Sequence, residues 1–212
     1  MQGPIDRLNG LARRLPTWPV WLIGLVPLAL LILAAATDGL GPDPVKGLER
    51  PLGEWGLRLL IASLAVSPLM RAGLRLVRFR RALGVLGFGY VALHFATWIA
   101  LDMSLRWAQI AGDLVKRPYI VVGFAALLLL VPLAVTSTNG WLRRLGAPRW
   151  RRLHRLAYPA ILLGAVHFVM IGKVWTGESL VYLALTATLL ALRLWPARAK
   201  PGRAGAATPA TP

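Results

Sequence analysis

The sequence predicts an all-α integral membrane protein, a bundle of six transmembrane helices with both termini on the cytoplasmic side. Three observations lead to this fold class. Of the 212 residues, 57% are hydrophobic and only 16% are charged, an unusual balance for a soluble domain. Six apolar stretches are long enough to cross a bilayer, which takes roughly 17–25 helical residues. The basic residues gather in alternate connections between these stretches, as in multi-span membrane proteins.

The six predicted spans follow one another with short connections, so no large extramembrane domain fits between them. In chain order they are Trp18–Ala36, 53–70, 83–101, 119–136, 153–171 and 175–195. Residues 1–17 are expected to form a cytoplasmic N-terminal segment, and residues 18–195 form the membrane domain. The remaining residues, 196–212, are rich in Pro, Ala and Gly, which predicts a disordered cytoplasmic tail.

The first span resembles a signal peptide, because Arg13 and Arg14 precede its apolar run. It is longer than the apolar core of an ordinary signal peptide, however. The residues that follow it, 37–39, also make a poor cleavage site. We therefore interpret the first span as a retained transmembrane helix.

The basic residues assign the two sides of the membrane. The N-terminal segment, the second and fourth connections and the tail together carry eighteen Lys and Arg residues against the single acid Asp6. The other connections carry six basic and seven acidic residues, and Arg58 lies within the second span. By the positive-inside rule the first group is cytoplasmic, which requires an even number of spans. We therefore interpret the net charge of +17 as a signal that orients the chain in the membrane. We expect the basic side to contact anionic lipid or a cytoplasmic donor, and we expect no nucleic-acid binding.

All three histidines lie inside or at the edge of apolar stretches, His94 in the third span and His154 and His167 in the fifth. A titratable side chain in hydrocarbon is costly, so a histidine kept there binds a ligand, relays protons or pairs with another group. Neutral imidazole is also a standard axial ligand of haem iron. The absence of Cys excludes iron–sulfur clusters and covalent c-type haem. The first hypothesis is therefore a membrane protein that binds haem non-covalently.

Two of these histidines are expected at similar depths in the bilayer. From the helical rise, His94 lies about 16 Å from the start of its span, and His167 lies about 20 Å beyond His154. A bis-histidine haem between the third and fifth spans would therefore use His94 and His167, in the outer half of the bilayer. His154 would lie at the cytoplasmic mouth. Gly87 and Gly164 on the same spans would let the helices and a flat macrocycle approach closely.

Other roles remain open for several of these residues. An intramembrane histidine also serves as an interhelical hydrogen-bond donor or a proton relay. His154 lies among arginines and could be an interfacial cation. Met103 and Met170 could serve as soft axial ligands, although methionine more often packs. Arg58 lies near the outer end of its span, where it could snorkel to the interface or pair with a haem propionate.

Two runs of residues resemble a known family. The run TSTNGWLRRLGAPRWRRLHRLAYPAILLGAVHF, preceded by RRALGVLGFGYVALHF, is similar to the MsrQ family. Members of that family are haem-binding membrane subunits of the periplasmic protein-methionine-sulfoxide reductase system, within the ferric-reductase-like transmembrane superfamily. The similarity extends from the first span to about Trp195. The most specific part is the motif LGxxxWxxLHRLxY followed by HF.

The resemblance implies a function and a set of ligands. The haem-ligand histidines of the family correspond to His94, His154 and His167. The family passes electrons across the bacterial inner membrane to a periplasmic molybdopterin-containing methionine-sulfoxide reductase, which repairs oxidised envelope proteins. Its electrons come from the quinone pool or a cytoplasmic flavin reductase, and flavin mononucleotide (FMN) has been associated with it. The chain would then be an electron conduit without substrate chemistry of its own.

The chain departs from the related NADPH oxidases and ferric reductases in two ways. Those proteins carry two histidines on each of two helices for two stacked haems, whereas Arg80 and Arg81 stand thirteen or fourteen residues before His94. One haem b is therefore expected, and a second one on His154 would lack an obvious second ligand. The sequence also has no cytoplasmic FAD/NADPH module and no GxGxxG motif, so its reductant must come from elsewhere.

Two other classes of protein fit the same residues. A stand-alone ferric or oxygen reductase would use the same haem to reduce a small diffusible acceptor. A non-redox membrane transporter would instead use the histidines as proton relays and would hold no haem.

Overall fold

The structure, a computed structural model, describes residues 3–172 and 175–194, and every regular element within them is helical. In chain order the helices are α1 (Pro4–Arg14), α2 (Trp18–Ala36), α3 (Pro44–Arg71), α4 (Val77–Thr97), α5 (Trp107–Lys116), α6 (Pro118–Val135), α7 (Asn139–Leu153), α8 (Ala157–Ile171) and α9 (Gly177–Leu194). A π-helical turn, Trp98–Asp102, continues α4, and a 3-10 turn, His154–Leu156, joins α7 to α8. The predicted all-α class is confirmed.

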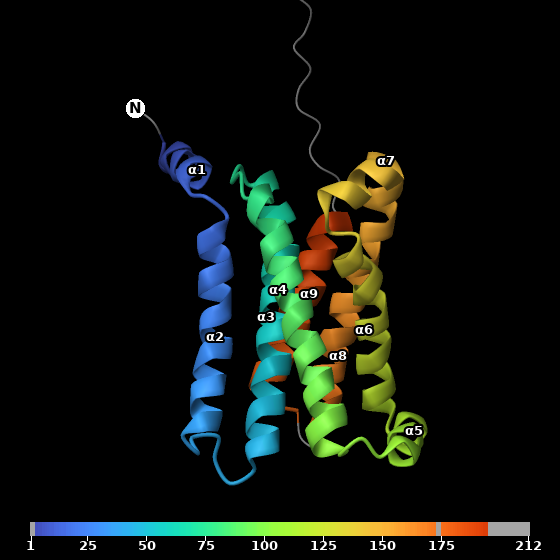
Figure 1. Cartoon of the computed structure of the whole chain (residues 1–212). Coiled ribbons are helices and arrows are strands. Elements are labelled where there is room, and N and C mark those ends of the chain that lie inside the picture. The colour runs from blue at the N-terminus through green and yellow to red at the C-terminus, as the bar shows by residue number, and fades with distance from the viewer. Residues whose placement is uncertain (1–2, 173–174, 195–212) are drawn as a thin grey trace, which may run out of the picture.

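Five helical segments in the described residues are long and apolar enough to cross a membrane. They are Trp18–Ala36, Pro44–Arg71, Val77–Asp102, Pro118–Val135 and Asn139–Ile171. Figure 1 shows these segments and α9 standing upright in one bundle. Because α9 is not among the five, the count of six spans and the cytoplasmic placement of the termini stay predictions. The tail predicted for 196–212 lies outside the described residues.

Hydropathy located the spans better than their ends. α2 has the predicted bounds, whereas α3 begins at Pro44, nine residues before the predicted start at residue 53. The reason is local: the Asp43 side chain caps α3 by accepting a hydrogen bond from Lys46 N, and proline suits the first helical turn. Charged residues fill these early turns of α3, so an apolar window excludes them.

Two helices lie where only connecting segments were predicted. α1 occupies the N-terminal segment and α5 the third connection, and both lie at the ends of the bundle in Figure 1. The helical path of the fifth span also begins earlier than residue 153, at Asn139, as α7. α7 bends at Gly146, where φ is 71°, a conformation that glycine adopts without the strain of a Cβ.

The buried core lies between α3, α6, α8 and α9. Its buried side chains are Leu57, Leu60, Ile61, Leu64, Leu130, Leu133, Ala160, Ile161, Ala165 and Leu189. Small residues bring α4 against α3: a Cβ on Gly87 would lie 2.8 Å from the Leu60 side chain and 3.2 Å from the Gly56 carbonyl oxygen. Gly87, which was expected to let helices and a flat macrocycle approach closely, therefore serves the packing of helices.

α2 is the least buried of the five membrane segments, and Tyr90 of α4 forms hydrogen bonds to its backbone. Tyr90 of α4 is 2% exposed, and its hydroxyl donates to Gly24 O at 2.7 Å and accepts from Leu28 N at 2.9 Å. The hydroxyl is thus inserted into the backbone hydrogen-bond ladder of α2, beside Pro27.

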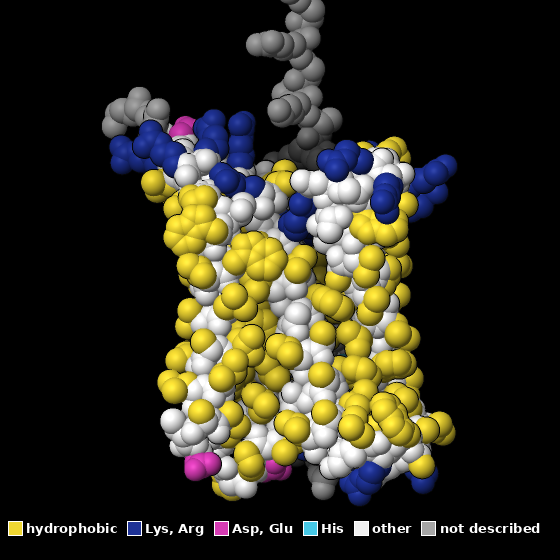
Figure 2. Space-filling view, viewed as in Figure 1, with side chains coloured by type: hydrophobic (Ala, Val, Ile, Leu, Met, Phe, Trp, Pro, Cys, Tyr) yellow, Lys and Arg dark blue, Asp and Glu magenta, His cyan; other side chains and the backbone are white. Residues whose placement is uncertain are grey.

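Charge distinguishes the two ends of the bundle. Figure 2 shows Lys and Arg gathered at the end that carries α1 and α7, which we call the basic end. It also includes the connection between α3 and α4. At the opposite end, Asp and Glu appear together with Lys and Arg. The structure therefore segregates charge by end, as the alternation of basic connections predicted.

Candidate functional site

His94 and His167 face each other inside the bundle, near the end opposite the basic end. His94 lies in the last turn of α4, and His167 lies near the end of α8. Their ring centroids are 6.3 Å apart and their ring planes cross at 71°. The structure therefore brings together the two histidines that depth in the bilayer had paired.

A backbone carbonyl from a neighbouring helix anchors each ring. His94 Nδ1 lies 2.8 Å from Glu49 O on α3, and His167 Nδ1 lies 2.7 Å from Tyr119 O on α6. A carbonyl oxygen only accepts, so Nδ1 donates in both rings, and the lone pair of a neutral imidazole is then on Nε2. Such a partner fixes the tautomer and orientation of a histidine that binds a metal.

A glycine makes room for each anchored ring. A Cβ on Gly53 would lie 3.0 Å from His94 Nδ1, and a Cβ on Gly123 would lie 2.7 Å from His167 Nδ1. Each glycine stands four residues after the anchoring carbonyl, on the same face of the same helix. Neither glycine was predicted to be a site residue from the sequence, where the only signal for each is a glycine within an apolar span.

The separation of the two rings suits two ligands of one metal ion. A metal–imidazole bond is about 2 Å long, so imidazoles on opposite sides of one iron have ring centres about 6 Å apart. Among the described residues, no cluster of three or more His, Cys, Asp or Glu could hold a bare metal ion. The two imidazoles thus fit a metal that brings its remaining ligands with it, as iron does in haem.

Both rings line a cavity of about 710 Å³ between α3, α4, α6 and α8. This volume lies within the range of roughly 300–1,000 Å³ found for small-molecule and cofactor sites. Gly164, which was expected to allow close approach, also lines it. Much of the wall is apolar, formed by Leu57, Leu60, Val91, Phe95, Phe124, Leu127, Leu130, Ile161 and Phe168. The cavity can therefore enclose a large flat apolar group between the two imidazoles.

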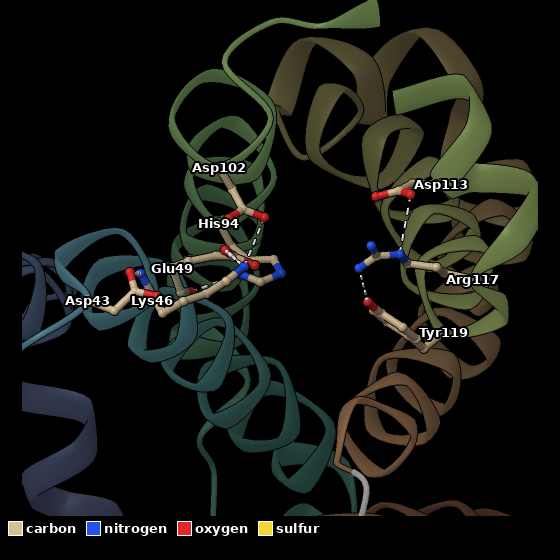
Figure 3. A network of polar contacts seen from close by, with 8 residues as sticks. All are labelled: Asp43, Lys46, Glu49, His94, Asp102, Asp113, Arg117 and Tyr119. Carbon is tan, nitrogen blue, oxygen red and sulfur yellow. Dashed lines mark hydrogen bonds and ion pairs between the residues drawn. The ribbon is translucent and has the colours of Figure 1, made fainter. Parts of the chain in front are cut away.

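On the α3–α4 side, the rim of the cavity is an ion-pair network. Lys46 Nζ lies 2.8 Å from a Glu49 carboxylate oxygen and 2.9 Å from one of Asp102. Glu49 therefore has two functions, since its backbone carbonyl anchors His94 and its side chain pairs with Lys46. Figure 3 shows His94 beside this network.

On the opposite side of the rim, Arg117 forms a second group of polar contacts (Figure 3). Its guanidinium lies 3.3 Å from Asp113 and donates to the Tyr119 hydroxyl at 3.2 Å. The hydrogen bond to Tyr119, followed by the charge of Asp113, raises the pKa of Arg117, which stays a cation. Tyr119 also has two functions: its hydroxyl binds Arg117, and its backbone carbonyl anchors His167.

The other predicted ligands lie away from this pair. His154 Nε2 lies 3.0 Å from Thr136 Oγ1, and its ring stacks on Trp150 with centroids 3.8 Å apart. Neither His154 nor the two methionines line the cavity. Met103 is buried in a small apolar cluster, and Met170 is 39% exposed. The structure thus places both methionines as packing or surface groups.

Arg58 does not line the cavity itself, but two of its polar partners, Glu54 and Glu178, do. Its guanidinium lies 3.1 Å from Glu54 and 2.9 Å from Glu178, and it donates to the Tyr182 hydroxyl at 2.7 Å. Glu178 and Tyr182 belong to α9, so Arg58 links α3 to α9. This pairing satisfies a charged side chain within an apolar segment.

These features define a class of protein: a membrane-embedded helical bundle in which two facing histidines, on the third and fifth candidate spans, line a cavity of cofactor size. The family described as ferric reductase like transmembrane component matches residues 52–165, more than half of the chain. The chain is also similar, over most of its length, to curated relatives named "Protein-methionine-sulfoxide reductase heme-binding subunit MsrQ". The one from Brucella anthropi is 45% identical over 181 residues, which are 84% of this chain and 82% of the relative.

Two more relatives of the same name agree with this. The one from Caulobacter vibrioides is 44% identical over 84% of this chain and 86% of its own length. The one from Brucella ovis is 47% identical over 84% of this chain and 82% of its own length. The chain therefore belongs to the MsrQ family, and the resemblance noted in the sequence is confirmed.

Proposed function

We propose that this chain is a b-type haem electron-transfer subunit and that His94 and His167 are the axial ligands of its haem. One observation carries the proposal: two imidazoles 6.3 Å apart, each with Nδ1 bonded to a backbone carbonyl, face one cavity. The names of the relatives support it, because those proteins are heme-binding subunits. The purely proton-relaying alternative does not account for the cavity.

The residues of the chain bind, orient and shield the cofactor. The two Nε2 atoms offer their lone pairs across the cavity, and the carbonyls of Glu49 and Tyr119 hold the rings in place. The apolar part of the cavity wall would surround the cofactor between them. Haem bound there supplies a one-electron ferric–ferrous couple whose potential depends on its axial ligands and on burial.

The partners follow from the family. The relatives are subunits of a protein-methionine-sulfoxide reductase. We therefore propose that this chain lies in a bacterial inner membrane and gives electrons to a periplasmic molybdopterin-containing reductase. The quinone pool or a cytoplasmic flavin reductase would be the donor. FMN, which has been associated with the family, would accompany that donor.

The end with His94 and His167 would then face the acceptor. The charged rim and α5 lie at this end, which makes them the docking surface in this proposal. His154, toward the basic end, would ligate a second haem only if its ring left Thr136 and Trp150. One haem is therefore the stoichiometry that the arrangement favours.

The test is a haem count on purified protein. We would record oxidised and dithionite-reduced visible spectra and a pyridine haemochrome assay for the unchanged chain and for His94→Ala, His167→Ala and His154→Ala. We expect a b-type spectrum that His94→Ala and His167→Ala each abolish and that His154→Ala retains. A colourless unchanged protein, produced with ample haem, would refute the proposal and favour the proton relay. A spectrum that only His154→Ala abolishes would place the haem elsewhere.

The acceptor is tested separately. A membrane containing the haem-loaded chain and supplied with a quinol as reductant should reduce methionine sulfoxide only when the molybdopterin subunit is added. If the reduced haem is instead oxidised equally fast by ferric chelates or oxygen alone, the stand-alone reductase alternative is favoured.

A further inference from the structure

A partly buried guanidinium at the basic end has hydrogen bonds but no acidic partner among the described residues. Arg193, near the end of α9, donates to Leu64 O of α3 at 2.7 Å and to the Tyr158 hydroxyl of α8 at 2.6 Å. Leu64 O needs a donor, because Pro68 stands four residues later and has no N–H to give. These hydrogen bonds explain why a long side chain with N–H donors stands at position 193. They do not explain why that side chain carries a positive charge.

The charge of Arg193 is not neutralised by any carboxylate among the residues that the structure describes. Its Nε is buried and has no hydrogen-bond partner. The guanidinium also lies against the ring of Tyr158, 4.6 Å from the ring centre. A partly buried cation without a counter-charge is costly, so such sites commonly hold an anion.

A second arginine adds to the positive potential. Arg71, the last residue of α3, donates to Leu192 O at 2.6 Å, on the turn of α9 that carries Arg193. Arg80 is also close enough to act on Arg193 electrostatically. Two arginines, Arg71 of α3 and Arg193 of α9, thus line one place at the basic end, and Arg80 of α4 adds positive charge in their vicinity.

An open cavity of about 490 Å³ lies at this place. It is lined by Ser67, Arg71, Tyr158, Leu190 and Arg193, so one wall offers N–H and O–H donors and another is apolar. The residues before Arg71, Leu69 and Met70, are exposed apolar side chains, 38% and 44% exposed. Exposed apolar surface, on which acyl chains could pack, thus lies next to Arg71 along α3.

We propose that this cavity is a binding site for the phosphate group of an anionic phospholipid, held by Arg193 and Arg71 at the basic end. Arg presents a planar fork of donors that matches phosphate oxygens. The apolar wall and the exposed side chains beside Arg71 favour a lipid over free phosphate as the source. The site is separate from the cavity lined by His94 and His167, so its test does not depend on haem.

The experiment uses the full chain in mild detergent. Retained lipid would be measured by native mass spectrometry after titration with phosphatidylglycerol, with phosphatidylcholine or with inorganic phosphate. We expect phosphatidylglycerol to bind more tightly than phosphatidylcholine. Arg193→Gln should weaken phosphatidylglycerol binding about fivefold to tenfold, whereas Arg193→Lys, which keeps the charge, should retain most of it.

Arg149→Gln is the matched control, because Arg149 is an exposed arginine of α7 at the same end. The substitution removes the same charge as Arg193→Gln. If it weakens binding as much as Arg193→Gln does, only the general charge of the basic end matters, and the site is refuted. Equal retention of phosphatidylcholine also refutes it. Full competition by inorganic phosphate at equal concentration would refute the assignment to a lipid. If Arg193→Gln does not fold, as judged by far-UV circular dichroism, Arg71→Gln tests the same cavity.

Discussion

The close contact between the His167 ring and Gly123 of α6 leads to a specific prediction for Gly123→Ala. The new Cβ would lie 2.7 Å from Nδ1, 2.8 Å from Cε1 and 3.0 Å from Cγ of the His167 ring. Ordinary contact begins at 3.4 Å, so the ring or the helix must move by 0.7 Å, the difference between these two distances. All three contacts are to atoms of the rigid imidazole ring, so the overlap cannot be relieved by a flexible chain end.

The displacement moves the ring away from its anchor. The hydrogen bond from Nδ1 to Tyr119 O is 2.7 Å long, and adding the same movement takes it past the roughly 3.2 Å limit of a good N–H···O bond. Loss of such a partner typically lowers metal affinity about 10- to 100-fold. Gly53→Ala should have a smaller effect, because its Cβ would lie 3.0 Å from His94 Nδ1, and the ring need move less.

The assay is a haem titration of the apoprotein followed by the Soret band, with the redox potential of the loaded protein as a second readout. Gly89→Ala in α4 is the matched control, because a Cβ there meets nothing within 4 Å. We expect Gly89→Ala to bind haem like the unchanged chain, Gly53→Ala to bind more weakly and Gly123→Ala to bind most weakly. If Gly123→Ala binds as tightly as Gly89→Ala, His167 is not a ligand held in the position that the structure gives it.

Two further predictions concern the orientation of the ligands and the attachment of α2. Because the planes of the His94 and His167 rings cross at 71°, the ferric protein should show the highly anisotropic low-spin EPR signal of near-perpendicular imidazoles, and a rhombic signal of coplanar rings would contradict this geometry. Tyr90→Phe removes the hydroxyl from the α2 ladder and should lower the free energy of unfolding in lipid by about 1 kcal/mol. Its haem content should be unchanged, since Tyr90 does not line the cavity, and unchanged stability in denaturant unfolding would argue against the inserted hydroxyl.

The pairing of His94 with His167 was predictable because it depends on depth, and depth follows from counting residues along apolar helices. The bounds of α2 were predictable for the same reason, since its ends coincide with the ends of an apolar run. α3 was harder, because its first turns are charged and its start depends on a local cap at Asp43. Hydropathy measures transfer into lipid, and it does not detect a helix that continues past the apolar region.

The anchors of the two ligands could not be predicted from the sequence. Every residue has a backbone carbonyl, so the choice of Glu49 O and Tyr119 O depends on how α3 packs against α4 and α6 against α8. Gly87 was expected to let helices and a cofactor approach closely, and in the structure it packs against Leu60 of α3 and does not line the cavity. A glycine in an apolar span shows that something approaches closely, and the three-dimensional structure is needed to show whether that is a helix or a ring.

The two halves of the site hold their imidazole rings in the same way, although the sequence shows no evident repeat. On α3 a carbonyl at residue 49 and a glycine at residue 53 hold one imidazole, and on α6 a carbonyl at residue 119 and a glycine at residue 123 hold the other. Both rings are therefore oriented by protein contacts alone. Ligands that are already in place need little rearrangement when iron changes its charge, and a small rearrangement favours fast electron transfer. The arrangement of α3 with α4 and of α6 with α8 thus connects helix packing to the function that we propose.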